Sequence, residues 1–327
     1  MKKHSLLFFI SAFLIVAFLC TITSTYAAKK STTTVKKKQT TRKAKTKVSK
    51  SGLQKISKNP YLGAIAIDAA TGKVLFEDNP DVKGYPASMV KMMNLLVILE
   101  AIEAKQITLQ DKVKISAEVA KVDGSQVYLK EREVHTVDDL IYALMIPSAN
   151  DAAMALALHY TGDKEKFISL MNKRAQELGM TDTLFSTVNG LPPAKGKPDV
   201  STPRDITKLC LELLKHPAAL RYTSTKERLF RTDSPKPLVM RNHNHLVGSF
   251  EGCDGFKTGY FRAAGFSIAA TVSKNGERVI AVIFGSADRN VRDSSAKNIL
   301  SKSFMELTAS LPTSVSDAQE ITASILE

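Results

Sequence analysis

Residues 265–284 read GFSIAATVSKNGERVIAVIF, in which two apolar, β-prone runs flank Asn275-Gly276. Asn-Gly is a strong hairpin signal, because both residues tolerate the positive φ angles of a two-residue turn. The stretch therefore predicts an antiparallel hairpin with strands over 265–272 and 278–284. A second hairpin is predicted near the start of the domain, where Ala64–Ile67 and Val74–Phe76 surround Thr71-Gly72.

Most of the chain between the two hairpins has a helical pattern, and one more helix is predicted after the second hairpin. The expected helices cover residues 88–104, 137–145, 151–159, 164–178, 203–215 and 294–310. Strands at both ends with helices between them are typical of the α+β class. We expect one antiparallel sheet, built from N- and C-terminal strands and flanked by helices, with a helical insertion beside it. A cleft between sheet and insertion is the expected ligand site.

The first 27 residues have the layout of a secretory signal peptide. Lys2-Lys3 precede the apolar run Leu6–Cys20, and Thr25-Tyr-Ala27 provides a small-residue cleavage site. The run is shorter than the roughly 20 residues that a membrane-spanning helix needs. We therefore expect export to the periplasm or another extracytoplasmic part of the cell envelope.

Positive charge is concentrated in the segment that follows. Residues 28–50 contain ten Lys or Arg and no acidic residue; twelve of the 46 basic residues lie in residues 1–50, which leaves 34 to face 32 acidic residues. The net charge of +14 is thus a property of the N-terminus, and a basic nucleic-acid surface across the folded part is excluded. Residues 28–57 are expected to form a disordered basic tail, either a solvated tether or a contact to an anionic envelope polymer or membrane surface. The folded domain is expected over 58–311, and a C-terminal tail over 312–327.

Ser88-Met-Val-Lys91 places a serine and a lysine three residues apart, on one face of the first expected helix. The rest of that helix is apolar on nearly every face, which indicates burial. Burial disfavours the charge of Lys91, so its amine is suited to take the proton of the Ser88 hydroxyl and make the serine a nucleophile. The same pattern is also compatible with a capping serine and a lysine that reaches solvent.

Two further motifs follow in order. Ser148-Ala-Asn150 lies between two expected helices, where a hydroxyl can relay a proton and an amide can hold a carbonyl, or where both can simply cap the next helix. Lys257-Thr-Gly259 precedes the strong hairpin, where Lys257 and Thr258 can face the carboxylate of a peptide aligned with a strand edge. Gly259 permits the close approach of another backbone. Together the three motifs indicate a serine acyl-enzyme for D-alanyl peptides or β-lactams.

The chain resembles the low-molecular-mass penicillin-binding proteins, the serine D-alanyl-D-alanine carboxypeptidase and endopeptidase family. The resemblance covers about residues 61–310 and implies the β-lactamase/transpeptidase-like fold. It rests on segments in family order: Thr71-Gly-Lys-Val-Leu, Pro86-Ala-Ser-Met-Val-Lys, Asn189-Gly-Leu, Ser201-Thr-Pro-Arg-Asp-Ile, Asn242-His-Asn and Asp254-Gly-Phe-Lys-Thr-Gly-Tyr.

The resemblance also implies roles for single residues. Ser88 would be the acylated nucleophile, Lys91 its general base and Ser148 the proton relay. The substrate-binding residues would be Asn150, Lys257, Thr258, Gly259 and Arg292. The oxyanion hole would use the backbone N–H groups of Ser88 and Phe261. Phe261 stands where the family often has a small hydroxyl residue, and the C-terminal β-rich domain and membrane helix of many relatives are not expected here.

We expect an exported carboxypeptidase that trims peptidoglycan stem peptides through a Ser88 acyl-enzyme and is acylated by β-lactams such as penicillin. The open alternatives are an endopeptidase that cleaves D-alanyl cross-links, a β-lactamase, and an inactive peptidoglycan-binding module. No cofactor or metal is expected, because the sequence has no metal-ligand spacing and no phosphate-binding loop. His243 and His245 are interpreted as loop or packing residues, since no Gly-x-Ser-x-Gly elbow accompanies them. Export would permit a Cys210–Cys253 disulfide without requiring one.

Overall fold

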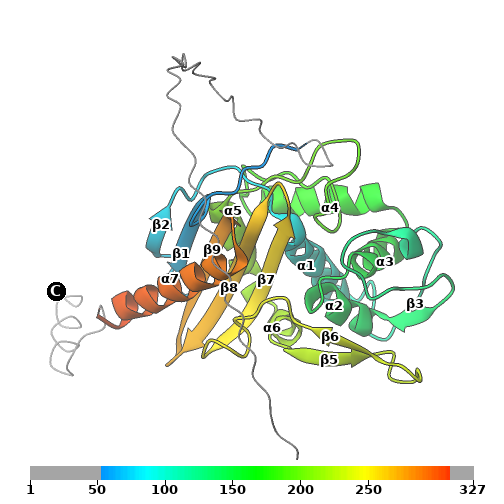
Figure 1. Ribbon diagram of the computed structural model, residues 1–327. Coiled ribbons are helices and arrows are strands. Elements are labelled where there is room, and N and C mark those ends of the chain that lie inside the picture. Colours follow the sequence, from blue (N-terminus) through cyan, green and yellow to red (C-terminus); the bar gives the residue numbers. More distant parts are fainter. Residues whose placement is uncertain (1–52, 310–327) are drawn as a thin grey trace, which may run out of the picture. The chain divides into compact units, whose positions relative to one another are not determined.

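A five-stranded antiparallel sheet with strand order β2-β1-β9-β8-β7 forms the centre of the domain (Figure 1). The structure, a computed structural model, describes residues 53–309, so the expected signal peptide, most of the expected basic tail and the C-terminal tail lie outside the described residues. Both predicted hairpins are confirmed, since β1 pairs with β2 and β8 with β9. The strands of the sheet are β1 (Gly63–Asp68), β2 (Val74–Asp78), β7 (Cys253–Phe261), β8 (Gly265–Lys274) and β9 (Glu277–Ser286).

The β8–β9 turn has the conformation that its sequence predicts. Asn275 and Gly276 have φ angles of +53° and +85°, the positive pair that a two-residue hairpin turn requires. The pleat of the sheet then divides its apolar residues between two cores. In β1, Ile65 and Ile67 join the core on the helical side, whereas Ala64 and Ala66 join the core beneath the C-terminal helix.

The helices of the described residues occupy both faces of the sheet (Figure 1). The C-terminal helix α7 packs on β8 and β9 through one core, and α1 and α5 belong to the other core, with α2, α3 and α4 beyond them. This arrangement confirms the predicted sheet with a helical region beside it. The helices are α1 (Val90–Glu103), α2 (Val137–Met145), α3 (Asn150–Thr161), α4 (Lys164–Glu177), α5 (Pro203–Leu214), α6 (Pro217–Thr223) and α7 (Arg289–Ala309).

Three small elements were not predicted, and one helix boundary was wrong. The additional elements are α6 and two short hairpins, β3 (Lys112–Lys114) with β4 (Val134–Thr136), and β5 (Glu227–Phe230) with β6 (Leu238–Arg241). Their strands are three or four residues long and largely exposed, so they lack the apolar alternation that marks a strand. Helix α7 begins five residues before the predicted start, because the Asp288 carboxylate accepts from the N–H groups of Asn290 (2.7 Å) and Val291 (3.2 Å).

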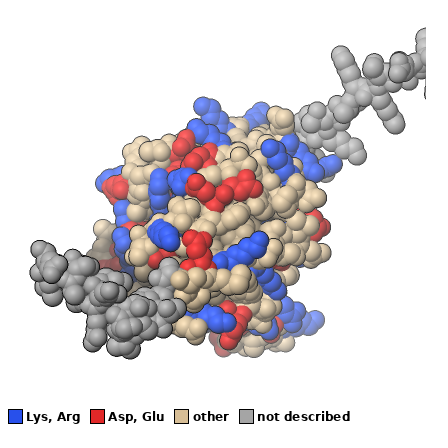
Figure 2. All heavy atoms as spheres, turned by 90° about the vertical axis from the view of Figure 1, so that its left-hand side faces the viewer, with Lys and Arg blue, Asp and Glu red and all other residues tan. Residues whose placement is uncertain are grey.

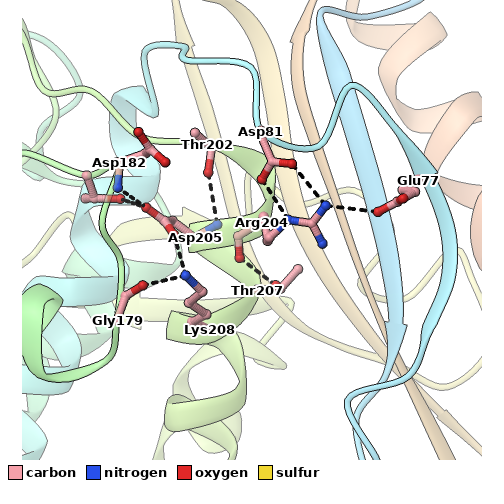
Figure 3. A network of polar contacts seen from close by, with 10 residues as sticks. Glu77, Asp81, Gly179, Asp182, Thr202, Arg204, Asp205, Thr207 and Lys208 are labelled. Carbon is pink, nitrogen blue, oxygen red and sulfur yellow. Dashed lines mark hydrogen bonds and ion pairs between the residues drawn. The ribbon is translucent and has the colours of Figure 1, made fainter.

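A polar network fixes the start of α5 (Figure 3). Thr202 caps the helix by accepting from the Asp205 N–H at 3.1 Å. The buried Asp205 carboxylate accepts from the N–H of Asp182 at 2.9 Å and from Lys208 at 2.8 Å. Arg204, which points the other way, binds Asp81 and Glu77. The network thereby ties α5 to the chain after α4 and to the region of β2, and the chain after α4 leads into the active-site region.

The surface of the domain carries charges of both signs. On the face shown in Figure 2, Lys and Arg side chains are interspersed with Asp and Glu. This distribution agrees with the near-neutral charge expected for residues 51–327. Between residues 53 and 309, no helix combines the length and the apolar character that crossing a membrane requires.

Candidate active site

Ser88 lies in a 3₁₀ turn, η1 (Ala87–Met89), directly before α1. Two glycines pack against the backbone of this turn. A Cβ on Gly259 of β7 would lie 2.4 Å from the Pro86 carbonyl oxygen, and a Cβ on Gly190 would lie 1.9 Å from the Ala87 carbonyl oxygen. The close approach predicted at Gly259 is therefore present, but the approaching backbone is the protein's own turn. Neither η1 nor α1 has a side-chain cap, so the capping interpretation of Ser88 is wrong.

The Lys91 side chain, one helical turn after Ser88, is fully buried and its amine contacts polar atoms. Its Nζ lies 3.0 Å from Ser88 Oγ, 2.7 Å from Asn150 Oδ1 and 2.6 Å from the Asn189 carbonyl oxygen. Burial, followed by the positive charge of Lys257, lowers the Lys91 pKa well below its ordinary value.

The contacts of Lys91 suit its neutral form. A neutral amine has two N–H donors and one lone pair, and the carbonyl oxygens of Asn150 and Asn189 can only accept. In the neutral form these two oxygens take both N–H groups, which leaves the lone pair for the proton of the Ser88 hydroxyl, 3.0 Å away. This geometry is suited to removal of the serine proton.

Ser148 and Asn150 lie at the junction of α2 and α3. Ser148 has a left-handed backbone, with φ +62°, and its buried Oγ has no hydrogen-bond partner within the described part of the chain. Asn150 accepts from Lys91 and donates through Nδ2 to the Asp123 carbonyl oxygen at 2.7 Å. The cap of α3 is Ala149, without a side-chain bond, so the simple capping interpretation is wrong. An unpartnered buried hydroxyl on strained backbone is typical of a functional site.

Lys257, Thr258 and Gly259 lie on β7, an edge strand, as predicted. The Lys257 side chain is buried, and burial together with the charge of Arg292 lowers its pKa to about 7. Thr258 and Tyr260 share a face of the strand and line the cavity. Phe261 is not among the lining residues; its ring lies 5.6 Å from the ring of Tyr85.

Arg292 was predicted before the last helix, but it lies within the first turn of α7. The side chain is 2% exposed, so it is not a surface arginine. Its Nε and Nη2 donate to Asp293 Oδ1 at 2.9 and 2.6 Å, and Nη1 lies 3.4 Å from the Ser267 carbonyl oxygen. Arg292 also borders the cavity, which places its charge near Thr258.

A cavity of about 300 Å³ brings the three motifs together. Lys91, Asn150 and Lys257 are not lining residues of this cavity, but they lie next to residues that are. Six of its lining residues carry no functional role in the sequence-based prediction. The lining residues are Ser88, Ser125, Ser148, His243, His245, Thr258, Tyr260, Phe266, Arg289 and Arg292.

The two histidines are loop residues, but the packing interpretation is wrong. Asn242 and Asn244 are buried and donate to backbone carbonyl oxygens, so the alternating histidines face outward and line the cavity. His243 is exposed at the cavity, yet partial desolvation and the charges of Lys257 and Lys91 lower its pKa to about 4. The alternation in Asn242-His-Asn-His245 was the available signal for this arrangement.

The family model of the D-alanyl-D-alanine carboxypeptidases matches residues 46–288. This chain belongs to that family. Among its relatives, the D-alanyl-D-alanine carboxypeptidase DacF of Bacillus subtilis is 35% identical over 243 residues, which is 74% of this chain and 62% of DacF. The D-alanyl-D-alanine endopeptidase of Escherichia coli is 32% identical over 245 residues, 72% of this chain and 76% of that protein.

Solved structures agree with the family assignment. Penicillin-binding protein D2 of Listeria monocytogenes, in its ampicillin-bound form, superposes with a TM-score of 0.68 at 29% identity, covering 75% of this chain and 97% of that one. The predicted transpeptidase-like α+β fold is therefore confirmed. The chain spans less than two thirds of the length of DacF.

One cluster outside the cavity brings metal-ligand types together. Ligand atoms of Glu100, Glu212 and His216 lie within 4.8 Å of one another. The Arg174 guanidinium already binds Glu100 at 2.7 Å and Glu212 at 2.6 Å, so a cation occupies that position. Cys210 and Cys253 are both free thiols.

Proposed function

We propose that this protein is an exported serine D-alanyl-D-alanine carboxypeptidase that trims peptidoglycan stem peptides and is acylated by penicillin. The observation that carries the proposal is the buried Lys91 amine, whose Nζ lies 3.0 Å from Ser88 Oγ and 2.7 and 2.6 Å from the carbonyl oxygens of Asn150 and Asn189. The family membership supports the same reaction class.

In the acylation step, Ser88 Oγ attacks the carbonyl carbon of the penultimate D-alanine, and its proton passes to Lys91 Nζ. The N–H groups of Ser88 and of one β7 residue bind the oxygen that becomes negative. We assign the second N–H to Tyr260 rather than Phe261, because Tyr260 borders the cavity. The amide bond then breaks, and the amine of the terminal D-alanine takes the proton from Lys91 through Ser148. Water finally hydrolyses the Ser88 ester, which restores the serine hydroxyl and releases the shortened peptide.

Substrate would align antiparallel to the edge of β7, held by main-chain hydrogen bonds. Protonated Lys257, with Thr258 and the buried Arg292, would bind the terminal carboxylate. The Asn150 side chain would bind the substrate backbone in addition to its contact with Lys91. No cofactor or metal has a role in this scheme.

Fluorescent penicillin tests the nucleophile directly. We expect stable label on the wild-type protein and none on Ser88→Ala, because the substitution removes the attacking oxygen. The measurement is a denaturing gel of both proteins after exposure, alongside an assay of D-alanine release. Label on both proteins would identify a different serine and contradict the proposal.

The dependence of kcat/KM on pH should show an alkaline limb near pH 7. Lys257, with a pKa of about 7, carries its charge below that pH and loses it above, so carboxylate binding weakens as pH rises. On the acid side the rate should fall where Lys91 becomes protonated, because an ammonium ion has no lone pair for the serine proton. A rate of D-alanine release that stays flat between pH 6 and 9 would contradict the role of Lys257.

Endopeptidase cleavage of D-alanyl cross-links is the second candidate. The observation that favours it is the 32% identical Escherichia coli endopeptidase, 76% of whose length this chain covers. Release of monomers from a cross-linked muropeptide would establish this activity. A β-lactamase would lose its penicilloyl label rapidly, and an inactive peptidoglycan-binding module would release no D-alanine.

Residues 28–50 are proposed to hold the exported protein at an anionic envelope polymer or membrane surface, because they carry ten basic residues and no acid. Deletion of these residues is expected to shift the protein from the envelope fraction to the soluble fraction after secretion. The measurement is immunoblotting of both fractions at low and moderate salt. If retention in the envelope fraction were unchanged, the segment would be only a solvated tether.

A further inference from the structure

Two arginines of α7 face the cavity, and they differ in their partners. Arg289 and Arg292 are three residues apart in the first turn of the helix, and both are lining residues. Arg292 donates to the Asp293 carboxylate through Nε and Nη2. Arg289 is exposed, and within residues 53–309 its guanidinium forms no ion pair. The neighbouring Asp288 carboxylate accepts from the N–H groups of Asn290 and Val291 at the start of α7.

Arg289 lies further along the cleft than the expected carboxylate site. Its guanidinium carbon is 5.9 Å from the Phe266 ring centroid, and Phe266 stacks on Tyr260 at 4.1 Å. Phe266 pairs with Tyr260 across the sheet, whereas Arg292 approaches Ser267 on β8. Three helical residues correspond to a rise of about 4.5 Å. The two arginines therefore lie beside successive positions along β7.

The direction of the substrate decides which part of it meets Arg289. A peptide antiparallel to β7 with its terminal carboxylate at Lys257 and Thr258 runs past Tyr260 with the residues that precede the scissile bond. The Tyr260 side chain is 55% exposed, so it offers a ring face to a substrate side chain. A guanidinium beside that face suits a carboxylate on an aliphatic stem.

We propose that Arg289, with the stacked rings of Tyr260 and Phe266, forms a second anion subsite. It selects stem peptides whose residue before the D-alanyl pair carries a side-chain carboxylate. The inference rests on the proposed carboxypeptidase function and adds the substrate class that the cleft prefers. Arg289 is thus a specificity residue, distinct from the inner carboxylate site of Lys257 and Arg292.

The test uses two N-acetylated peptides that end in D-Ala-D-Ala and differ only in glutamate or glutamine before that pair. We expect the wild-type kcat/KM for D-alanine release to be about five-fold higher for the glutamate peptide, as for a partly exposed charge-assisted hydrogen bond. In Arg289→Gln the ratio should fall to near one, and Arg289→Lys should recover part of it. Arg262→Gln, which removes an exposed arginine from the β7–β8 turn outside the cavity lining, should keep the wild-type ratio.

The ratio of the two peptides cancels any general loss of activity, and penicillin labelling of each variant shows that its cleft is folded. Equal kcat/KM values for the two peptides in wild type, or a five-fold ratio that survives in Arg289→Gln, would overturn the subsite. Absence of both D-alanine release and penicillin label in wild type would instead overturn the proposed function, and the subsite with it.

Discussion

Replacement of Lys91 by alanine is expected to slow acylation of Ser88 by about 10⁴-fold, the upper range for loss of a general base. The Ser88 hydroxyl would keep its place in η1 but lose the lone pair that receives its proton. The Asn150 and Asn189 carbonyl oxygens would also lose their shared donor. The measurement is the second-order rate constant for labelling by fluorescent penicillin.

The variant Lys91→Arg tests whether residue 91 must be able to lose its proton. Arginine is not deprotonated in proteins, so it stays positively charged, offers no lone pair and should not restore the rate. Thermal unfolding of both variants controls for loss of the fold. Labelling of folded Lys91→Arg at the wild-type rate would show that a neutral amine is not required.

Gly190→Ala is also expected to slow acylation strongly, although Gly190 takes no part in the chemistry. At φ +84° an added Cβ would stand 1.9 Å from the Ala87 carbonyl oxygen and 2.9 Å from the Ser88 nitrogen, so the turn that carries Ser88 must move. A displacement near 1 Å costs about 100-fold in rate. Stability should fall by roughly 3 kcal/mol, which lowers Tm by about 6–12 °C in a domain of this size.

Gly72→Ala is the matched control. Gly72 also has a positive φ, +74°, but an added Cβ would meet no atom within 4 Å. Gly72→Ala should lower the free energy of unfolding by about 1 kcal/mol, the strain of a left-handed backbone alone. The rate of acylation should not change. If the two alanine variants lost stability and labelling equally, contact with the Ser88 turn would not be the cause.

The predictions that succeeded were those with a local cause. Asn275 and Gly276 both tolerate the positive φ angles of a two-residue hairpin turn, so this turn depends on the two residues themselves. The apolar run after Lys91 indicated a buried helix, and burial alone implies that the lysine charge is disfavoured. The turn and the apolar helix pattern can be predicted from neighbouring residues, whereas the segments that bury the helix cannot.

The missed parts of the site have non-local causes. The hydrogen bonds of Lys91 include one to the backbone carbonyl of Asn189. Every residue has a backbone carbonyl, so the sequence does not indicate which one makes this contact. The start of α7 is the exception, because it was misplaced for a local reason: Asp288 caps the helix, and the correct start brings Arg289 into the helix turn beside the cavity. His243 was assigned to the loop but not to the cavity, because the side on which a loop side chain points depends on what the flanking asparagines bind.

The sequence by itself determined the chemistry available to this protein: a serine paired with a lysine on one helix, an amide and a hydroxyl at a helix junction, and a lysine on a strand. Tertiary structure alone decided that these groups meet. Edge strand β7 lies against the η1 turn at Gly259, and the α2–α3 junction reaches Lys91 across 59 residues of chain. The physical reason is that burial and proximity, which lower the pKa of Lys91 and bring Lys257 and Arg292 to one cavity, are properties of packing between distant segments.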